Sequence, residues 1–269
     1  MVVGRPTLPS VRSLRHGAVV GIAWALTCAH APWCVVRAQD TFSLVAVDPA
    51  SGAIVSAGAS CLDGDVVPGG ARIVSTIVPG VGALHTQSYY SADNQARGAG
   101  LLAAGTSAPE LVDLLVAGDV SRSPTLRQYA AITTGGPTVE TSAFTGRDCA
   151  PYAGHVVLPD LVLAGNILLD SLVLARMRTA FRDAAAEGRP LVERALLALE
   201  AVAYAGADRR CAPAGISSRS AFLRLALPSD GVDDLAVDLA VEYPVGGRDP
   251  IDLLGERFRA ATGAARIAD

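Results

Sequence analysis

The pattern of apolar and polar positions divides the chain after residue 40 into blocks of strands and blocks of helices. Short apolar runs bounded by Pro/Gly turns predict strands, and apolar residues at helical spacing predict amphipathic helices. The predicted strands cover residues 41–48, 53–60, 73–78, 81–87, 126–133, 138–145, 162–166, 221–227 and 235–242. The predicted helices cover residues 94–104, 107–117, 170–186, 190–205 and 249–262, and residues 145–155 are expected to form a loop.

The order of these elements is strands, two helices, strands, two helices, strands and a final helix. Segregated blocks of this kind favour antiparallel sheets with helices packed outside them. The sequence therefore predicts an α+β layered fold and not an alternating, doubly wound one. The first strand, residues 41–48, is expected to lie in the centre of its sheet.

Residues 1–38 have the pattern of a signal peptide, in which a basic segment precedes an apolar run over residues 17–29. The apolar run is too short for a comfortable membrane span. The sequence predicts a leader over residues 1–38 and a single exported domain over residues 39–269. That domain is expected to be periplasmic or secreted and to have no membrane contact after leader removal, with a retained N-terminal anchor as the alternative.

Two cleavage sites compete in the leader, because residues 29–31 and residues 36–38 both fit a small-x-small rule. The second site leaves Gln39 and Asp40 ahead of Thr41. If Thr41 becomes the first residue, it carries both a nucleophilic hydroxyl and its own base, the α-amine. The alternative is that Thr41 simply begins a buried strand, where threonine is favoured.

The net charge of the chain is −4, and each of its 22 basic residues is arginine. Removing the basic leader makes the domain more acidic, so nucleic acid is not expected as a partner. The absence of lysine from the sequence excludes a lysine nucleophile, a Schiff base and a phosphate-binding P-loop lysine.

Export places three cysteines, Cys61, Cys149 and Cys211, in an oxidising compartment. They could form one disulfide in any of three pairings. None shares a CxxC spacing with another, so cysteine catalysis is not favoured.

Seven segments of the chain together resemble the domain of unknown function 1028 family. They are TFSLVAVD (41–48), GAS (58–60), VGALHTQ (81–87), AFTG (143–146), Cys149 with YAGH (152–155), GNIL (165–168) and GADRR (206–210). The resemblance covers residues 41–260. It implies an N-terminal-nucleophile (Ntn) hydrolase-like fold, a four-layer αββα sandwich with two antiparallel sheets between helix layers.

The chain departs from the family pattern at two places. Members without a leader commonly begin Met-Thr, whereas Gln39 and Asp40 precede the threonine here. Members often carry lysine after the Ala-Ser of the second strand, where this chain has Cys61, so a lysine-assisted mechanism is excluded. The exported branch that the chain is similar to tends to carry both Cys61 and Cys211, which makes this pair the preferred disulfide.

Several polar residues are candidates for a site around Thr41. Asn166 follows Gly165 at a strand end and is the first candidate to stabilise an oxyanion, with Asn94 as a second. The serines on neighbouring strand positions, Ser43 and Ser60, are expected beside Thr41.

The two histidines of the domain are further candidates. His85, on an apolar strand, and His155, in a loop, are each either site residues or structural residues. Neither belongs to a metal-ligand spacing, so no metal is expected, and no cofactor is expected either.

Asp208, Arg209 and Arg210 follow a predicted helix end and are expected in a loop. The two arginines could bind a substrate carboxylate in a bidentate manner. Equally, Asp208 could pair with Arg210 as a structural lock, and the sequence leaves both open.

Two functions from different classes are compatible with these residues. The first is an Ntn-type amidohydrolase or peptidase acting on a small-molecule amide or a peptide-like substrate. The second is a non-catalytic exported binding or structural domain whose blocked Thr41 has lost its base. A cell-wall-associated factor is a third option that rests on export alone, and a homodimer is one option for assembly. The mature N-terminus distinguishes the first two functions.

Overall fold

The structure, a computed structural model, describes residues 41–135 and 138–265. The predicted leader and the residues Gln39 and Asp40 lie outside the described residues. Across these ranges, no helix combines the length and the apolar character that a membrane span requires.

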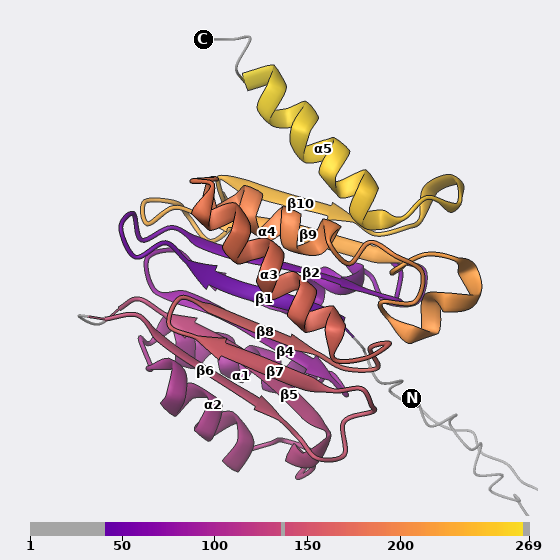
Figure 1. Ribbon diagram of the computed structural model, residues 1–269. Helices are drawn as coiled ribbons and strands as arrows, with labels where there is room; N and C mark the ends of the chain where they lie inside the picture. The colour runs from indigo at the N-terminus through magenta and orange to yellow at the C-terminus, as the bar shows by residue number, and fades with distance from the viewer. Residues whose placement is uncertain (1–40, 136–137, 266–269) are drawn as a thin grey trace, which may run out of the picture. The chain divides into compact units, whose positions relative to one another are not determined.

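The strands form two antiparallel sheets (Figure 1). The six-stranded sheet has the order β10-β9-β2-β1-β8-β7 and contains β1 (Thr41–Val47), β2 (Ile54–Ser60), β7 (Gly154–Leu158), β8 (Leu161–Gly165), β9 (Ser220–Ala226) and β10 (Val237–Val241). The four-stranded sheet has the order β3-β4-β5-β6 and contains β3 (Ser75–Val78), β4 (Gly82–Ser88), β5 (Arg127–Thr133) and β6 (Glu140–Thr145). The first strand lies between β2 and β8, which confirms its predicted central place.

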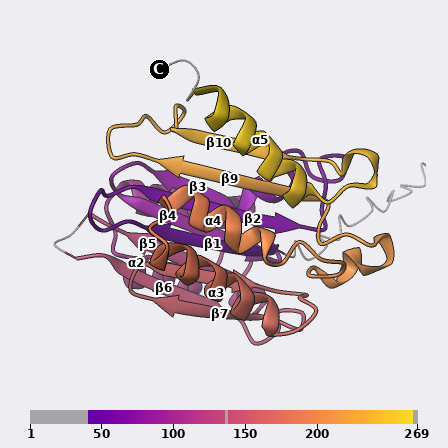
Figure 2. The same ribbon diagram turned by 45° about the horizontal axis from the view of Figure 1, so that its top comes forward.

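Five α-helices among the described residues cover the sheets, and the mixed α+β class is confirmed. The helices α1 (Ala92–Ala103) and α2 (Ala108–Ala117) contact the four-stranded sheet. The helices α3 (Leu172–Ala186), α4 (Leu191–Glu200) and α5 (Pro250–Ala265) contact the six-stranded sheet. In Figure 2, α4 lies between α3 and α5 on this sheet. The short 3₁₀ helices are η1 (Gly70–Val74), η2 (Pro124–Leu126), η3 (Arg209–Ala214) and η4 (Val245–Gly247).

Alternation along β1 explains how one strand serves two apolar cores. Phe42, Leu44 and Ala46 pack in the cluster that includes α3, α4 and α5. Val45 and Val47 point the other way, into a cluster to which both sheets contribute. A third cluster joins α1 and α2 to the outer side of β4 and β5. Thr41 and Ser43 therefore share the face of β1 that is turned to the second sheet.

Two sequence predictions were wrong in detail. The predicted loop over residues 145–155 runs into β7, which begins at Gly154. This strand was missed because it is a short edge strand with the exposed residues His155 and Val157, and so lacks a continuous apolar run. The segment after Asp208 is the 3₁₀ helix η3 and not an open loop, and the Asp208 side chain caps it by accepting from the Arg210 N–H.

Candidate active site at the start of β1

Thr41 begins β1, and a polar residue lies on each side of it in the sheet. It pairs with Ser60 of β2, and on the other side the Asn166 N–H donates to the Thr41 carbonyl at 3.3 Å. On each of these strands, the residues that lie an even number of positions away belong to the apolar cluster between the two sheets. Thr41, Ser60 and Asn166 therefore face the second sheet. Thr41 itself is 1% exposed.

The layer between the sheets is polar at this end and apolar at the other. On β1, Thr41 and Ser43 are followed on the same face by Val45 and Val47. The other strands change in the same direction: the polar positions are Ser56 and Ser60 on β2, His85 and Gln87 on β4, Gln128 on β5 and Asn166 after β8. All of these side chains are buried, so each polar group needs a partner within the protein.

Gln128 determines how the buried carboxamides are oriented. Its Nε2 donates to the carbonyls of Gly165 at 2.9 Å and Gly154 at 3.0 Å, and carbonyl oxygens can only accept. Its Oε1 therefore faces Gln87 and Asn166, whose amide nitrogens donate to it at 2.7 and 3.1 Å. The Nε2 of Gln87 also donates to the Thr41 carbonyl at 3.2 Å. The two glycine carbonyls thus fix the orientation of the Gln128 carboxamide, and through it the orientation of Gln87 and Asn166.

Asn166 is left with a buried oxygen that has no partner. One N–H of its carboxamide donates to Gln128, and its Oδ1 has no hydrogen-bond partner among the residues that the structure describes. The second N–H of the same nitrogen is the group that an oxyanion role would use. The structure brings Asn166 to Thr41, and its role as a donor stays a prediction.

His85 joins the two sheets within this polar end. Its Nδ1 lies 2.8 Å from the Oγ of Ser43, and its Nε2 lies 2.6 Å from the Oγ of Ser56. Burial, with a smaller contribution from the charge of Arg224, lowers the pKa of His85 to about 3. The ring is therefore neutral at neutral pH, and both of its nitrogens are engaged.

The pair of Asp208 and Arg210 lies beside Ser60, the cross-strand partner of Thr41. Oδ1 and Oδ2 of Asp208 accept from Nε and Nη2 of Arg210 at 3.1 and 2.7 Å, and Oδ2 also accepts from the Cys61 N–H at 2.8 Å. Nη2 of Arg210 lies 3.5 Å from the Oγ of Ser60. Of the two readings left open by the sequence, these bonds favour the structural lock for Asp208 and Arg210. Arg209 is exposed.

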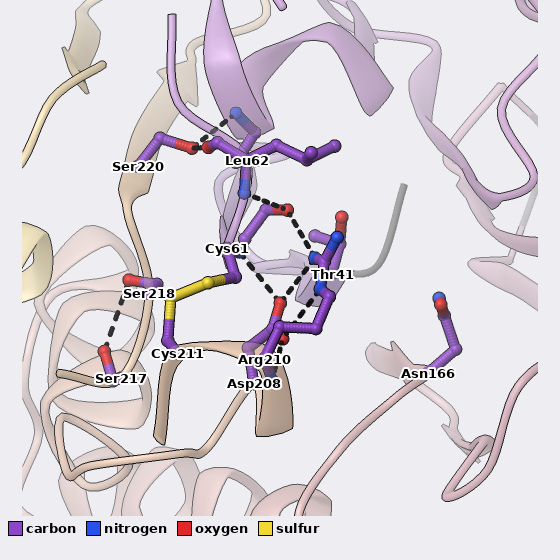
Figure 3. Close-up of polar contacts among 12 residues, drawn as sticks. Thr41, Cys61, Leu62, Asn166, Asp208, Arg210, Cys211, Ser217, Ser218 and Ser220 are labelled. Carbon is purple, nitrogen blue, oxygen red and sulfur yellow. Dashed lines mark hydrogen bonds and ion pairs between the residues drawn. A yellow bond between two sulfur atoms is a disulfide. The ribbon is translucent and has the colours of Figure 1, made fainter. Parts of the chain in front are cut away.

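A disulfide joins Cys61 to Cys211, with a Cα–Cα distance of 5.7 Å. It links the segment after Ser60 to η3, which carries Arg210, and so closes the lock covalently (Figure 3). The third cysteine, Cys149, is buried, and its thiol donates to the Arg127 carbonyl at 3.3 Å.

The side chains of two predicted residues, Asn94 and His155, bond to groups other than Thr41. The side chain of Asn94 donates to Asp119 at 2.6 Å and to the hydroxyl of Tyr129 at 3.2 Å. Tyr129 belongs to the core on the helix side of the four-stranded sheet. His155 is exposed on β7, and its Nδ1 lies 2.8 Å from the Oγ1 of Thr145. Among the described residues, no group of three His, Cys, Asp or Glu side chains could hold a metal ion.

The chain matches a known protein family over most of its length. Residues 41–252 match the family of unknown function DUF1028, and the matched region begins at Thr41. The chain belongs to the DUF1028 family. It is similar to a DUF1028 protein of known crystal structure, SPO2555 from Silicibacter pomeroyi, with 25% sequence identity and a TM-score of 0.64 over 83% of this chain and 90% of that chain. Among curated proteins, none matches the chain.

Four neighbours of the site in this DUF1028 protein were not predicted from the sequence: Gln87, Gln128, Ser56 and Arg224. A signal for Gln87 and Ser56 exists in the sequence. Gln87 stands two positions after His85, and Ser60 four positions after Ser56, on strands that are otherwise apolar or small. Polar residues at alternate positions of a buried strand indicate one polar face.

Proposed function

We propose that this DUF1028 protein is an exported Ntn-type amidohydrolase or peptidase that cleaves a small amide or a peptide-like substrate with Thr41. The observation that carries the proposal is the environment of Thr41: its carbonyl is held by Gln87 and Asn166, and the unpartnered Asn166 oxygen lies in the same polar end of the layer. We further propose that the two sheets and their helices form the four-layer αββα sandwich of the Ntn hydrolases. The arrangement of the three apolar cores supports this assignment.

The proposed reaction uses both functional groups of an N-terminal threonine. The α-amine takes the proton of Oγ1 while Oγ1 attacks the substrate carbonyl carbon. The tetrahedral intermediate collapses, the C–N bond breaks, and the leaving amine takes the proton from the α-ammonium group. Water, deprotonated by the α-amine, then hydrolyses the acyl ester and restores Thr41. An α-amine has a pKa of about 7.7 to 8.0, which suits this task near neutral pH.

Asn166 has the second role in this mechanism. Cross-strand neighbours have Cβ atoms about 4.5 to 5.5 Å apart, a distance at which the Asn166 carboxamide reaches the environment of Oγ1. Its second N–H stabilises the oxyanion, and its Oδ1 accepts an N–H from the substrate amide or from the Thr41 amine. The reaction needs neither metal nor cofactor, because nucleophile and base belong to one residue.

Export is proposed together with the activity. A disulfide between Cys61 and Cys211 is typical of a protein that folds in an oxidising compartment. We therefore place the mature domain in the periplasm or outside the cell.

The activity can be tested with two forms of the protein, one beginning at Thr41 and one beginning at Gln39, against a panel of amides and short peptides. Only the form that begins at Thr41 is expected to hydrolyse a substrate. Thr41→Ser should retain measurable activity, and Thr41→Ala should lower kcat by at least about a thousandfold. Equal activity of the two N-terminal forms, or of Thr41→Ala, would refute the proposal.

The burial of Thr41 favours the alternative of a non-catalytic binding domain. At 1% exposure, the threonine offers no open surface to a substrate. Under the catalytic proposal, the form that begins at Thr41 is the one that opens this end of β1. If that form shows no turnover while both forms bind the same ligands in thermal-shift assays, the binding domain is the better description.

A further inference from the structure

A continuous line of side-chain hydrogen bonds crosses both sheets and ends at Thr41. It starts at Arg224 of β9, whose Nη1 lies 3.2 Å from the Oγ of Ser75, and that oxygen lies 2.7 Å from the Oγ of Ser56. Ser56 contacts Nε2 of His85 at 2.6 Å, and Nδ1 contacts Ser43 at 2.8 Å. The line then continues through residues already described, from Ser43 to Gln87 at 2.7 Å and from Gln87 to the Thr41 carbonyl at 3.2 Å.

The carbonyls of Gly165 and Gly154, which accept from Gln128, determine which group donates in each hydrogen bond of this line. Gln128 obliges Gln87 to turn its Oε1 to Ser43, so the Ser43 hydroxyl must donate its single hydrogen to Gln87. Its oxygen must then accept, and Nδ1 of His85 must carry the ring proton. In the neutral ring, Nε2 is consequently an acceptor.

The same argument extends to the other end of the line. Because Nε2 of His85 accepts, Ser56 donates to it and in turn accepts from Ser75. Ser75 accepts from Arg224, a group that can only donate. The requirements set by Gln128 at one end and Arg224 at the other therefore agree, and all donors point toward Thr41. Bonds aligned in one direction strengthen one another.

We propose that His85, as the neutral Nδ1–H tautomer, is a positioning residue for the reaction of Thr41. It holds Ser43, Ser43 holds Gln87, and Gln87 holds the carbonyl of the residue whose hydroxyl and amine react. This inference rests on the proposed function for its catalytic consequence, and the hydrogen-bond direction stands independently of it. A displacement of about 1 Å in such a residue costs about a hundredfold in rate.

The charged groups around His85 act to keep this tautomer neutral. Arg224 of β9 lies at the end of the line, and the positive charge opposes protonation of the ring. Asp238 of β10 lies 3.4 Å from Nε of Arg224 and also pairs with Arg72 of η1, so its charge is balanced by two arginines. The ring of Phe222, on β9, is apolar and meets the imidazole edge-on, with the two ring centroids 5.8 Å apart.

The tautomer can be measured by ¹⁵N NMR of histidine-labelled mature protein. The expected result is a neutral ring for His85 with its proton on Nδ1, unchanged between about pH 5 and pH 8. A proton on Nε2, or a charged ring in this range, would overturn the proposal. This readout does not depend on any substrate.

The positioning role can be tested by two matched variants, His85→Asn and His85→Gln. The Asn amide reaches the place of Nδ1 and can still donate to Ser43, whereas the Gln amide reaches the place of Nε2 and loses that bond. We expect kcat within about threefold of wild type for His85→Asn and at least about tenfold lower for His85→Gln, with KM changed less than about twofold. Urea unfolding confirms that both variants fold.

Equal kcat in the two variants would contradict the positioning role. If no amide is hydrolysed by the wild-type form that begins at Thr41, the proposed function fails, and the carbonyl ¹³C shift of Thr41 then decides the inference. His85→Gln should move this shift and His85→Asn should leave it in place. The opposite result, or no difference, would overturn the hydrogen-bond line.

Discussion

Asn166 lies across the end of the β1–β8 ladder from Thr41, and its backbone N–H donates to the Thr41 carbonyl at 3.3 Å. The side chain of Asn166 is consequently placed by backbone geometry and then oriented by Gln128. A polar side chain held so firmly, yet with an unpartnered buried oxygen, is suited to meet a group that arrives from outside.

Substitution of Asn166 by alanine should therefore affect turnover more than folding. We expect kcat to fall by about a hundredfold to a thousandfold, which is the usual effect of removing one oxyanion donor. The free energy of unfolding should fall by about 1 kcal/mol, because one hydrogen bond to Gln128 is lost.

The matched control for this change is Asn94→Ala, because Asn94 and Asn166 are the two asparagines of the chain. Asn94 bonds to buried Asp119, so its replacement should destabilise the protein and leave kcat nearly unchanged. If both variants lose turnover equally, Asn166 has no special role.

Gln128→Leu should be among the most destabilising substitutions between the sheets. It removes the donor to the carbonyls of Gly165 and Gly154, the acceptor of the Asn166 amide and one of the two acceptors of the Gln87 amide. We expect a loss of about 2 to 4 kcal/mol. Gln95→Leu is the control, because Gln95 is half-buried and its Nε2 donates to the rotatable hydroxyl of Thr76. Urea unfolding of both variants should show a much smaller loss for Gln95→Leu, and similar losses would argue against this role of Gln128.

Removal of the disulfide should destabilise the protein and loosen the lock beside Thr41. The bond joins residues separated by 150 positions, and we expect Cys61→Ala/Cys211→Ala to lose about 2 to 5 kcal/mol. A reductant should lower the unfolding midpoint of wild type and of Cys149→Ala, but not that of the double variant. Sensitivity of the double variant to reductant, or peptide mapping that finds both thiols unoxidised, would contradict this pairing.

The pKa of His85, lowered by burial to about 3, gives the protein an acid-sensitive element. An unfolded histidine has a pKa of about 6.5, so only the unfolded chain takes up this proton as the pH falls below that value. The associated stability is present above about pH 6.5 and is lost progressively down to about pH 3.

This pH dependence is measured by urea unfolding of wild type and His85→Asn between about pH 4 and pH 7. The wild type should lose up to about 1.4 kcal/mol more per pH unit than the variant over the lower part of this range. Parallel pH profiles would show that His85 does not titrate in this way.

Most elements could be predicted from periodicity and turn residues, because β1 and β2 are apolar runs on either side of a Pro/Gly turn and α2 begins with a Ser107 cap. The strand β7 could not, since an edge strand with exposed His155 and Val157 resembles a loop. The strand β7 forms because it pairs with β8 along its length, and this tertiary contact is not encoded in the local sequence.

Some residues of the candidate site could be predicted from the sequence and others could not. Thr41 and its neighbours Ser60 and Asn166 were predicted because strand alternation and a strand end are local features. Gln128 and Arg224 were missed because their importance depends on which strands of two different sheets face one another. Asn94 was named for its chemistry alone, and the fold places it on the other side of the four-stranded sheet.

The most direct test of the account is the identity of the first residue of the protein purified from its native compartment, determined by intact mass and terminal peptide sequencing. The account predicts that the mature chain begins at Thr41, so that the hydroxyl and its α-amine base are both present. A stable chain that begins at Gln39 would leave Thr41 without an α-amine and would contradict the proposed mechanism.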